Sequence, residues 1–449
     1  MMNSGLLKRL TKILIPDCAE FFFGCCLLLS ANTLMADGGI PIFRVDTADK
    51  SGREIGQELG TAFKQHFPDI EKRYDAYLST FITQPLFNKW LQQRVQAVKP
   101  QIKQAYREEV EGIASRWQIT TQDQLGDGLL SLNEYWFLLL IPDVGRQTNC
   151  SGFGVWGKAS KSGQSVVGRN MDWHTNSDLR SLQAITVYHN KQGGMVNIGF
   201  AGYVGIISGF NQDGLYLAHL DSPLLQAFPN ETNKSSIIFD LRQALETYSS
   251  IKPTSQYLAR YAYSFSHNIL MADPNNIKVL EQPQGLLAHL RDDKSRYRLD
   301  KAWNRPNQIA VVNCYVLADS PGNCFKSQDI LRWERFKALA KFGRDNQADI
   351  SNIIQIMFDR ANSHQEIFNA NTVQSMVYTP SDGKLRLYAA PVSGMHPDVP
   401  HMLEFDDLLP EPDAAMEQWL NILNLLIIAS ATLLIAVFVY IKKYSALKS

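Results

Sequence analysis

Thr-Asn-Cys-Ser-Gly-Phe-Gly-Val-Trp-Gly at residues 148–157 and Gly-Arg-Asn-Met-Asp-Trp at residues 168–173 are the stretches that decide the fold. The first alternates glycine with apolar residues, a polar turn follows, and the second is again strand-like, so together they predict a β-hairpin. A hairpin brings its two ends together, and Cys150 is therefore expected to lie near Arg169 and Asp172. An arginine beside a thiol favours the reactive thiolate, whereas the plainer alternative is an Arg–Asp pair at a sheet edge.

Four better-known motifs do not fit this sequence. The glycines of residues 152–157 have dinucleotide-loop spacing, but they lie inside a predicted strand and do not open a helix. The nine histidines lack zinc-site spacing, and no Gly-x-Ser-x-Gly elbow occurs. A papain-like pairing of Cys150 with His267 or His289 would require the cysteine to open a helix. We therefore predict no cofactor and no metal.

The rest of the chain alternates between helical and strand-like segments. Residues 50–140 are predicted to be mainly helical, with helices at 53–66 and 99–117. Further strands are expected at 184–189, 195–200, 204–210, 215–221, 268–272, 277–281, 373–378 and 384–389, and further helices at 236–248, 254–263, 328–341 and 350–360. Clustered hairpins followed by paired helices predict antiparallel sheets covered by helical layers.

Both ends of the chain carry apolar segments. Basic residues precede an apolar run at 21–29, so residues 1–36 resemble a secretory signal peptide. Residues 420–441 are long and apolar enough to span a bilayer, and Lys442 and Lys443 follow directly. The positive-inside rule places these lysines in the cytoplasm and the preceding domain outside the cytosol, in a periplasm or a secretory lumen.

The charge balance and the cysteines restrict the possible partners and the cellular compartment. Charged residues make up 20% of the chain and balance to a net charge of zero, so nothing favours nucleic acid as a partner. Outside the predicted signal peptide the cysteines are Cys150, Cys314 and Cys324. An oxidising compartment favours a Cys314–Cys324 disulfide and leaves Cys150 as an odd thiol, either reactive or simply buried.

The hairpin motif is specific enough to suggest a family. Cys-Ser-Gly-Phe from Cys150 onward, with the stretch at 168–173, resembles the core motif of the isopenicillin-N acyltransferase-like and choloylglycine hydrolase-like families of Ntn hydrolases. The similarity covers about residues 40–391 in the right order. Its other parts are residues 106–114, 132–133, 211–223 and 267–273.

The resemblance implies an α+β fold, an αββα sandwich of antiparallel sheets. Combined with the apolar segments at the two ends, the resemblance divides the chain into a signal peptide (1–36), a helical pro-segment (37–149), a catalytic core (150–395), a stalk (396–419), a transmembrane helix (420–441) and a cytoplasmic tail (442–449). It also implies autoproteolysis before Cys150, whose freed amine then acts as the base. Asn149 stands where the penicillin-type relatives usually carry glycine, and Asn149-Cys150-Ser151 spells a glycosylation sequon that we expect to be unused.

Roles for individual residues follow from the same resemblance. Arg169 would favour the thiolate and Asp172 would hold the amine, while the side chain of Asn268 and the backbone N–H of Asp221 would form the oxyanion hole. Residues three apart on a flat strand point to opposite faces. Arg169 and Asp172 can therefore both face the thiol only if the strand bends or bulges near Asn170, or if one residue lies past its end.

The predicted function is an amidohydrolase or acyltransferase that acts on linear, non-peptide C–N bonds of small N-acyl amides. A lipid amidase resembling ceramidase-like or phospholipase B-like enzymes is an alternative, favoured by the apolar segment at 420–441. A catalytically silent cell-surface binding protein with the same fold is the alternative from another class. The intact set of Cys150, Arg169, Asp172 and Asn268 argues against it.

Overall fold

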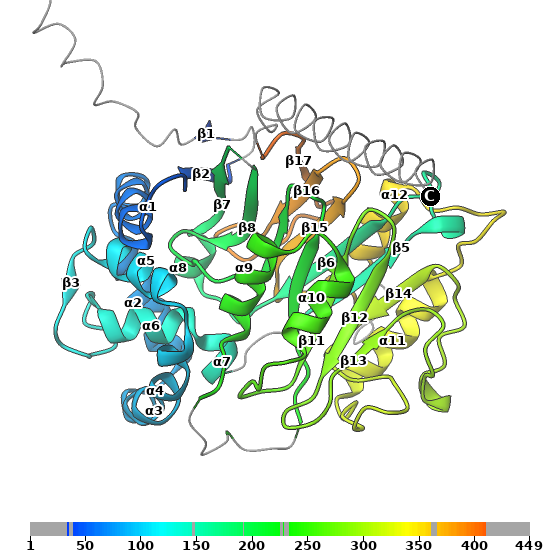
Figure 1. Ribbon diagram of the computed structural model, residues 1–449, viewed down its shortest axis with the longest axis horizontal. Coiled ribbons are helices and arrows are strands. Elements are labelled where there is room, and N and C mark those ends of the chain that lie inside the picture. The colour runs from blue at the N-terminus through cyan, green and yellow to red at the C-terminus, as the bar shows by residue number, and fades with distance from the viewer. Residues whose placement is uncertain are drawn as a thin grey trace, which may run out of the picture.

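The computed structural model describes residues 34–35 (backbone only), 39–145, 149–191, 193–224, 228, 233–360 and 366–409. The predicted membrane helix at 420–441, the tail at 442–449 and all of the predicted signal peptide except residues 34–35 lie outside the described residues. No described helix combines the length and apolarity needed to cross a membrane. Figure 1 shows two main sheets with helices on both outer sides, which is the mixed α/β architecture with antiparallel sheets that the sequence predicts.

The larger sheet has nine described strands in the order β1-β2-β7-β8-β9-β10-β11-β12-β13. Their bounds are Leu34–Met35, Pro41–Asp46, Gln183–Asn190, Gly193–Phe200, Ser208–Asn211, Tyr216–Asp221, His267–Ala272, Ile277–Gln282 and His289–Arg291. Neighbours are antiparallel except β2 and β7, which run parallel. Because β2 comes from the segment at 37–149, this mainly helical segment is built into the larger sheet.

The smaller sheet has the strand order β14-β5-β6-β15-β16-β17. Their bounds are Gln308–Val311, Ser151–Val155, Val166–Asp172, Thr372–Thr379, Lys384–Ala389 and Leu403–Phe405. The predicted hairpin is present as β5 and β6, with Ser151 opposite Asn170. β17 lies inside the predicted stalk and pairs with β16, so the folded domain extends past the predicted boundary at residue 395.

Glycines in β5 allow the two sheets to approach closely. A Cβ atom added at Gly152 would come within 2.6 Å of Leu270 in β11, and one at Gly154 within 2.4 Å of Ile277 in β12. The alternate residues, Phe153 among them, belong instead to the core beneath the helices of the smaller sheet. The Gly-x-Gly spacing that resembles a dinucleotide loop therefore serves packing between sheets.

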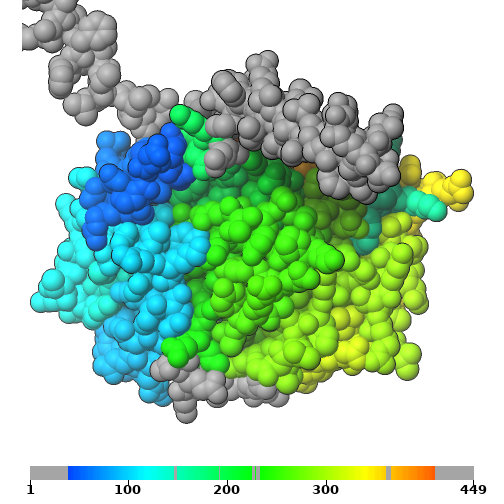
Figure 2. All heavy atoms as spheres, viewed as in Figure 1, coloured from blue at the N-terminus to red at the C-terminus, as the bar shows by residue number. Residues whose placement is uncertain are grey.

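Helices form the outer layers. α9 (Ile237–Thr247) contacts β8, β9 and β10, and α10 (Ile251–Leu258) packs beside it. On the other side α11 (Ser327–Leu339) contacts β14, and α12 (Ile350–Met357) contacts β5, β6 and β15. The N-terminal helices form one side of the molecule, coloured blue to cyan in Figure 2. They are α1 (Gly52–His66), α2 (Ile70–Phe81), α3 (Gln84–Trp90), α4 (Gln96–Val98), α5 (Gln104–Ala114), α6 (Leu132–Leu139) and α7 (Ile141–Val144).

A buried ion pair joins these N-terminal helices to the layer above the larger sheet. Arg242 of α9 contacts Glu109 of α5 at 2.7 Å, and both side chains are at most 3% exposed. Tyr188 of β7 donates to the same carboxylate at 3.0 Å. The segment before Cys150 and the segment after it therefore share both a sheet and a buried charge pair.

Candidate active site

Cys150 lies at the entrance to β5, between the two sheets. Alternation along the strand places it on the same face as Gly152, which pairs with Arg169 of β6 and faces the larger sheet. Nη2 of Arg169 lies 3.2 Å from Cys150 Sγ and also donates to the carbonyl of His219 at 2.7 Å. Nη1 of Arg169 donates to the Ser208 hydroxyl. Thiol and guanidinium are both fully buried, so this charge acts on the sulfur with little screening from water.

Asp172 points to the other face of β6. Its carboxylate accepts hydrogen bonds from Arg332 at 3.1 Å, Asn369 at 2.8 Å and the Thr372 hydroxyl at 2.7 Å. β6 is continuous through Asp172, and the register shift lies in its partner β15, after Thr372. The strand therefore needs no bulge at Asn170. The Arg169 side chain contacts the thiol on one face, and the Asp172 side chain lies on the other face, where it contacts Arg332.

Arg332 is a residue of the site that the sequence analysis missed. It is fully buried on α11 and spans from the Asp172 carboxylate to the backbone carbonyl of Asn149, to which Nη1 donates at 3.0 Å. Its Nε donates to the carbonyl of Glu366 at 3.2 Å. Asn149 is fixed further, because its N–H donates to the Asp172 carbonyl at 3.0 Å. The only available signal was an arginine between Leu331 and Trp333 in a predicted helix, which does not identify a partner 160 residues away.

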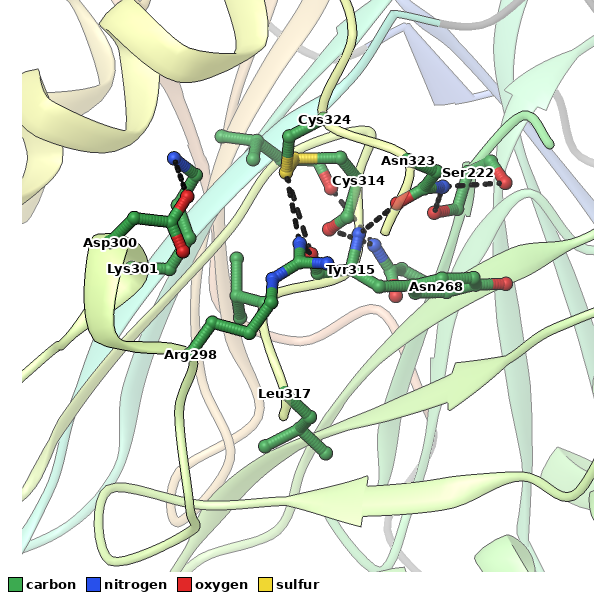
Figure 3. The surroundings of a disulfide bond; sticks show 12 residues. Ser222, Asn268, Arg298, Asp300, Lys301, Cys314, Tyr315, Leu317, Asn323 and Cys324 are labelled. Carbon is green, nitrogen blue, oxygen red and sulfur yellow. Dashed lines mark hydrogen bonds and ion pairs between the residues drawn. A yellow bond between two sulfur atoms is a disulfide. The ribbon is translucent and has the colours of Figure 1, made fainter. Parts of the chain in front are cut away.

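Asn268 and Asp221 lie on adjacent strands, β11 and β10, at the same end of the larger sheet. The Asn268 amide donates to the carbonyl oxygens of Val312 at 2.9 Å and Cys314 at 3.1 Å, as Figure 3 shows in part. Both of its hydrogens are thus engaged in the uncleaved chain. Asn313 donates to the carbonyl of Asp221 at 2.7 Å. Their predicted oxyanion role stays a prediction, and for Asn268 it requires that one of these two carbonyls be released.

The predicted disulfide between Cys314 and Cys324 is confirmed. It closes a loop that is tied to the end of β10, because Asn323 donates to the Ser222 hydroxyl at 2.9 Å (Figure 3). Within the loop, Asn323 accepts the Tyr315 N–H at 2.6 Å. Since Cys314 also accepts from Asn268, the disulfide loop helps to set the position of that amide. Among the described cysteines, Cys150 is the one that forms no disulfide.

The outer face of the larger sheet carries a buried cluster that the histidine spacing did not reveal. His219 Nε2 and His267 Nδ1 lie 2.8 Å apart, and Asp221 Oδ1 lies 3.7 Å from His219. Their ligating atoms all fall within 4.8 Å of one another, a separation that a metal ion could bridge. Burial lowers the pKa of His219 to about 4, so its ring is neutral at neutral pH. The two rings already form a hydrogen-bonded pair.

A cavity of about 390 Å³ lies elsewhere, between α1, α5, α9 and the β7–β8 hairpin. Tyr106, Glu109 and Arg242 are among its lining residues. None of the five predicted site residues lines it, so this cavity and the Glu109–Arg242 pair are separate from the surroundings of Cys150.

Comparison of the sequence with known protein families gives a match. Residues 159–391, just over half of the chain, match the family described as acyl-coenzyme A:6-aminopenicillanic acid acyl-transferase. The matched range contains Arg169, Asp172, Asp221, Asn268 and Arg332, and it begins shortly after Cys150. No curated protein matches the sequence.

Several solved structures are similar at low identity. An N-acylethanolamine-hydrolyzing acid amidase ortholog of Caenorhabditis elegans is 15% identical over 51% of this chain and 93% of that chain, with a TM-score of 0.39. A mutant conjugated bile acid hydrolase of Clostridium perfringens is 14% identical over 57% of this chain and 92% of that chain, with a TM-score of 0.37. Penicillin V acylase of Agrobacterium tumefaciens is 13% identical over 57% and 86%, with a TM-score of 0.37.

At these identities and TM-scores the structural likenesses support no conclusion about function, and the family match carries the assignment. It confirms the superfamily that the hairpin motif predicts, and the matched family consists of amide hydrolases and acyltransferases acting on bonds other than peptide bonds. The chain belongs to the acyl-coenzyme A:6-aminopenicillanic acid acyl-transferase family of the Ntn-hydrolase superfamily.

Proposed function

We propose that Cys150 is the nucleophile of an amidohydrolase or acyltransferase that acts on small N-acyl amides. The observation that carries this is the 3.2 Å contact between Arg169 Nη2 and Cys150 Sγ. A buried guanidinium beside a buried sulfur stabilises the thiolate, which is the attacking form of cysteine. Family membership supplies the class of bond, a C–N amide bond other than a peptide bond.

Maturation by autoproteolysis at the Asn149–Cys150 bond belongs to the same proposal. Cys150 Sγ attacks the carbonyl carbon of Asn149, so that a C–S bond forms, the C–N bond breaks and the departing amine takes up a proton. Water then hydrolyses the thioester and leaves a carboxylate on Asn149 and a free thiol and amine on Cys150. Arg332 Nη1, 3.0 Å from the Asn149 oxygen, supports this step because it stabilises negative charge developing on that oxygen.

In the cleaved enzyme the Cys150 amine would serve as the base for its own thiol. The thiolate attacks the substrate carbonyl, the substrate amine leaves, and water or an acceptor amine resolves the acyl-Cys150 thioester. Asp172 would hold the amine, and Asn268 with the Asp221 N–H would bind the oxyanion. Cys150 is fully buried in the uncleaved chain, so cleavage also has to open the site before a substrate can enter.

The apolar segment at 420–441 leads us to place this domain on the non-cytosolic side of a membrane. A substrate panel separates the two enzymatic alternatives. N-acyl amino acids and N-acyl amines as substrates favour the proposed amidase, whereas turnover restricted to ceramide-like or phospholipid substrates favours a lipid amidase.

Purified ectodomain tests the nucleophile and the maturation together. We expect wild type to yield a fragment whose N-terminal residue is Cys150 and to be trapped by a thiol-directed acyl probe, whereas Cys150→Ala stays uncleaved and unlabelled. Cys150→Ser reports whether a weaker nucleophile still cleaves slowly. Uncleaved wild type would reject the free-amine base, and an unlabelled wild type without amide turnover would leave the silent binding protein as the remaining interpretation.

A further inference from the structure

Asn149, the residue before the candidate nucleophile, is held through its backbone N–H, its carbonyl and its side-chain NH2 group. Its N–H donates to the Asp172 carbonyl at 3.0 Å, and its carbonyl accepts from Arg332 at 3.0 Å. Its side-chain amide donates to Gln328 Oε1, also at 3.0 Å. The backbone contacts set the direction of the carbonyl group, and the side-chain contact restricts rotation of the whole residue.

The two side chains that hold Asn149 come from one face of one helix. Gln328 and Arg332 are four residues apart on α11, so they lie one turn above each other. Arg332 is itself anchored by Asp172 at the end of β6. α11 is thereby tied to β6, the hairpin partner of the strand that follows the cleavage point, and it places Gln328 beside Asn149.

This contact explains why asparagine occupies a position where a small residue would be expected. A glycine at residue 149 could keep both backbone hydrogen bonds, but it would have no group to offer Gln328 and more backbone freedom. Attack of the sulfur on the preceding carbonyl depends on the dihedral angles at that peptide, and misplacement of a reacting group lowers rates steeply. A side-chain hydrogen bond that restricts those dihedrals is therefore a means of setting the cleavage rate.

We propose that Gln328 is a positioning residue for the cleavage at Asn149–Cys150 and acts through its hydrogen bond to the Asn149 side chain. The inference rests on the proposed autoproteolysis, and it adds a residue for which neither the hairpin motif nor the helical pattern predicts a role. Gln328 touches no reacting atom, so its effect is confined to the orientation of the residue that carries the attacked carbonyl.

The test is the rate at which full-length precursor yields the two fragments, followed on denaturing gels, with folding checked by thermal unfolding. We expect Gln328→Leu and Asn149→Ala each to slow cleavage about tenfold, because each removes the same hydrogen bond. The double variant should be no slower than either single variant. Gln328→Glu keeps the acceptor oxygen and should cleave near the wild-type rate. Glu334→Leu, an exposed position on the same helix, is the matched control.

The outcomes distinguish a failure of the positioning role from a failure of the proposed autoproteolysis. Wild-type cleavage with an unchanged rate in Gln328→Leu overturns the positioning role and leaves autoproteolysis intact. Effects that multiply in the double variant overturn it as well, because the two residues would then act independently. A Gln328→Glu variant as slow as Gln328→Leu also overturns it, because the acceptor oxygen would then not be the group that positions Asn149. No cleavage in wild type overturns the autoproteolysis and this role together.

Discussion

Replacing Arg332 by methionine tests the part of the site that holds the cleavage point. Arg332 and Asp172 are both at most 1% exposed and lie 3.1 Å apart. Two unit charges about 4 Å apart attract by about 4 kcal/mol at an effective dielectric constant of about 20. Methionine would leave the Asp172 carboxylate buried with only Asn369 and Thr372 as donors, and removing one partner of a buried pair typically costs about 3–5 kcal/mol.

The measurement is the free energy of unfolding by denaturant in the Cys150→Ala background, where the chain remains a single uncleaved species. We expect Arg332→Met to lose about 3–5 kcal/mol, whereas Arg332→Met combined with Asp172→Asn should recover more than 1 kcal/mol, because the unpaired charge is gone. A loss below about 1 kcal/mol in Arg332→Met would show that water reaches the pair. Additive losses in the double variant would refute the ion pair as the cause.

Three further predictions follow from the described contacts and the sequence. Burial raises the pKa of Asp143 to about 7, so the folded chain keeps a proton that the unfolded chain releases above about pH 4. The free energy of unfolding should therefore fall between about pH 4 and pH 7, by up to about 1.4 kcal/mol per pH unit from this group, and parallel pH curves for wild type and Asp143→Asn would contradict this. Asn268→Ala should lower amide turnover by correctly processed protein at least tenfold, and near-wild-type turnover would remove it from the oxyanion hole. Protease added to intact vesicles should digest the domain only from the non-cytosolic side, and digestion from the cytosolic side would reject 420–441 as the anchor.

The parts of the fold that could be predicted from sequence are those with a local pattern. β5 and β6 were recognisable because glycine and apolar residues alternate there, and the disulfide because two cysteines lie ten residues apart. β14 and β17 escaped prediction because four and three residues are too few to show a period. A strand predicted from residue 204 begins only at Ser208, since the Ile206 N–H bonds to Ile238 of α9 and leaves the ladder.

The same distinction applies to the site: contacts within the hairpin could be predicted from sequence, and contacts from a distant helix could not. Cys150 and Arg169 could be paired because hairpin geometry alone brings them together. Arg332 and Gln328 could not be placed, because α11 reaches the cleavage point through the fold and no short-range spacing reports that contact. A strand at two-residue alternation does predict that Arg169 and Asp172 face apart. The unpredicted part was that the residue before the thiol occupies Asp172's side of the sheet.

The hydrogen bond from Arg332 to the Asn149 carbonyl has a consequence immediately after cleavage. Hydrolysis would turn that carbonyl into the carboxylate of a new chain end, formed against the buried Arg332 guanidinium. The N-terminal piece would stay attached through β2 and the Glu109–Arg242 pair, so the new carboxylate would have a high effective concentration beside Arg332, where it formed. A newly matured molecule would therefore keep the new carboxylate as a bound anion that pairs with Arg332 on Asp172's side of the sheet.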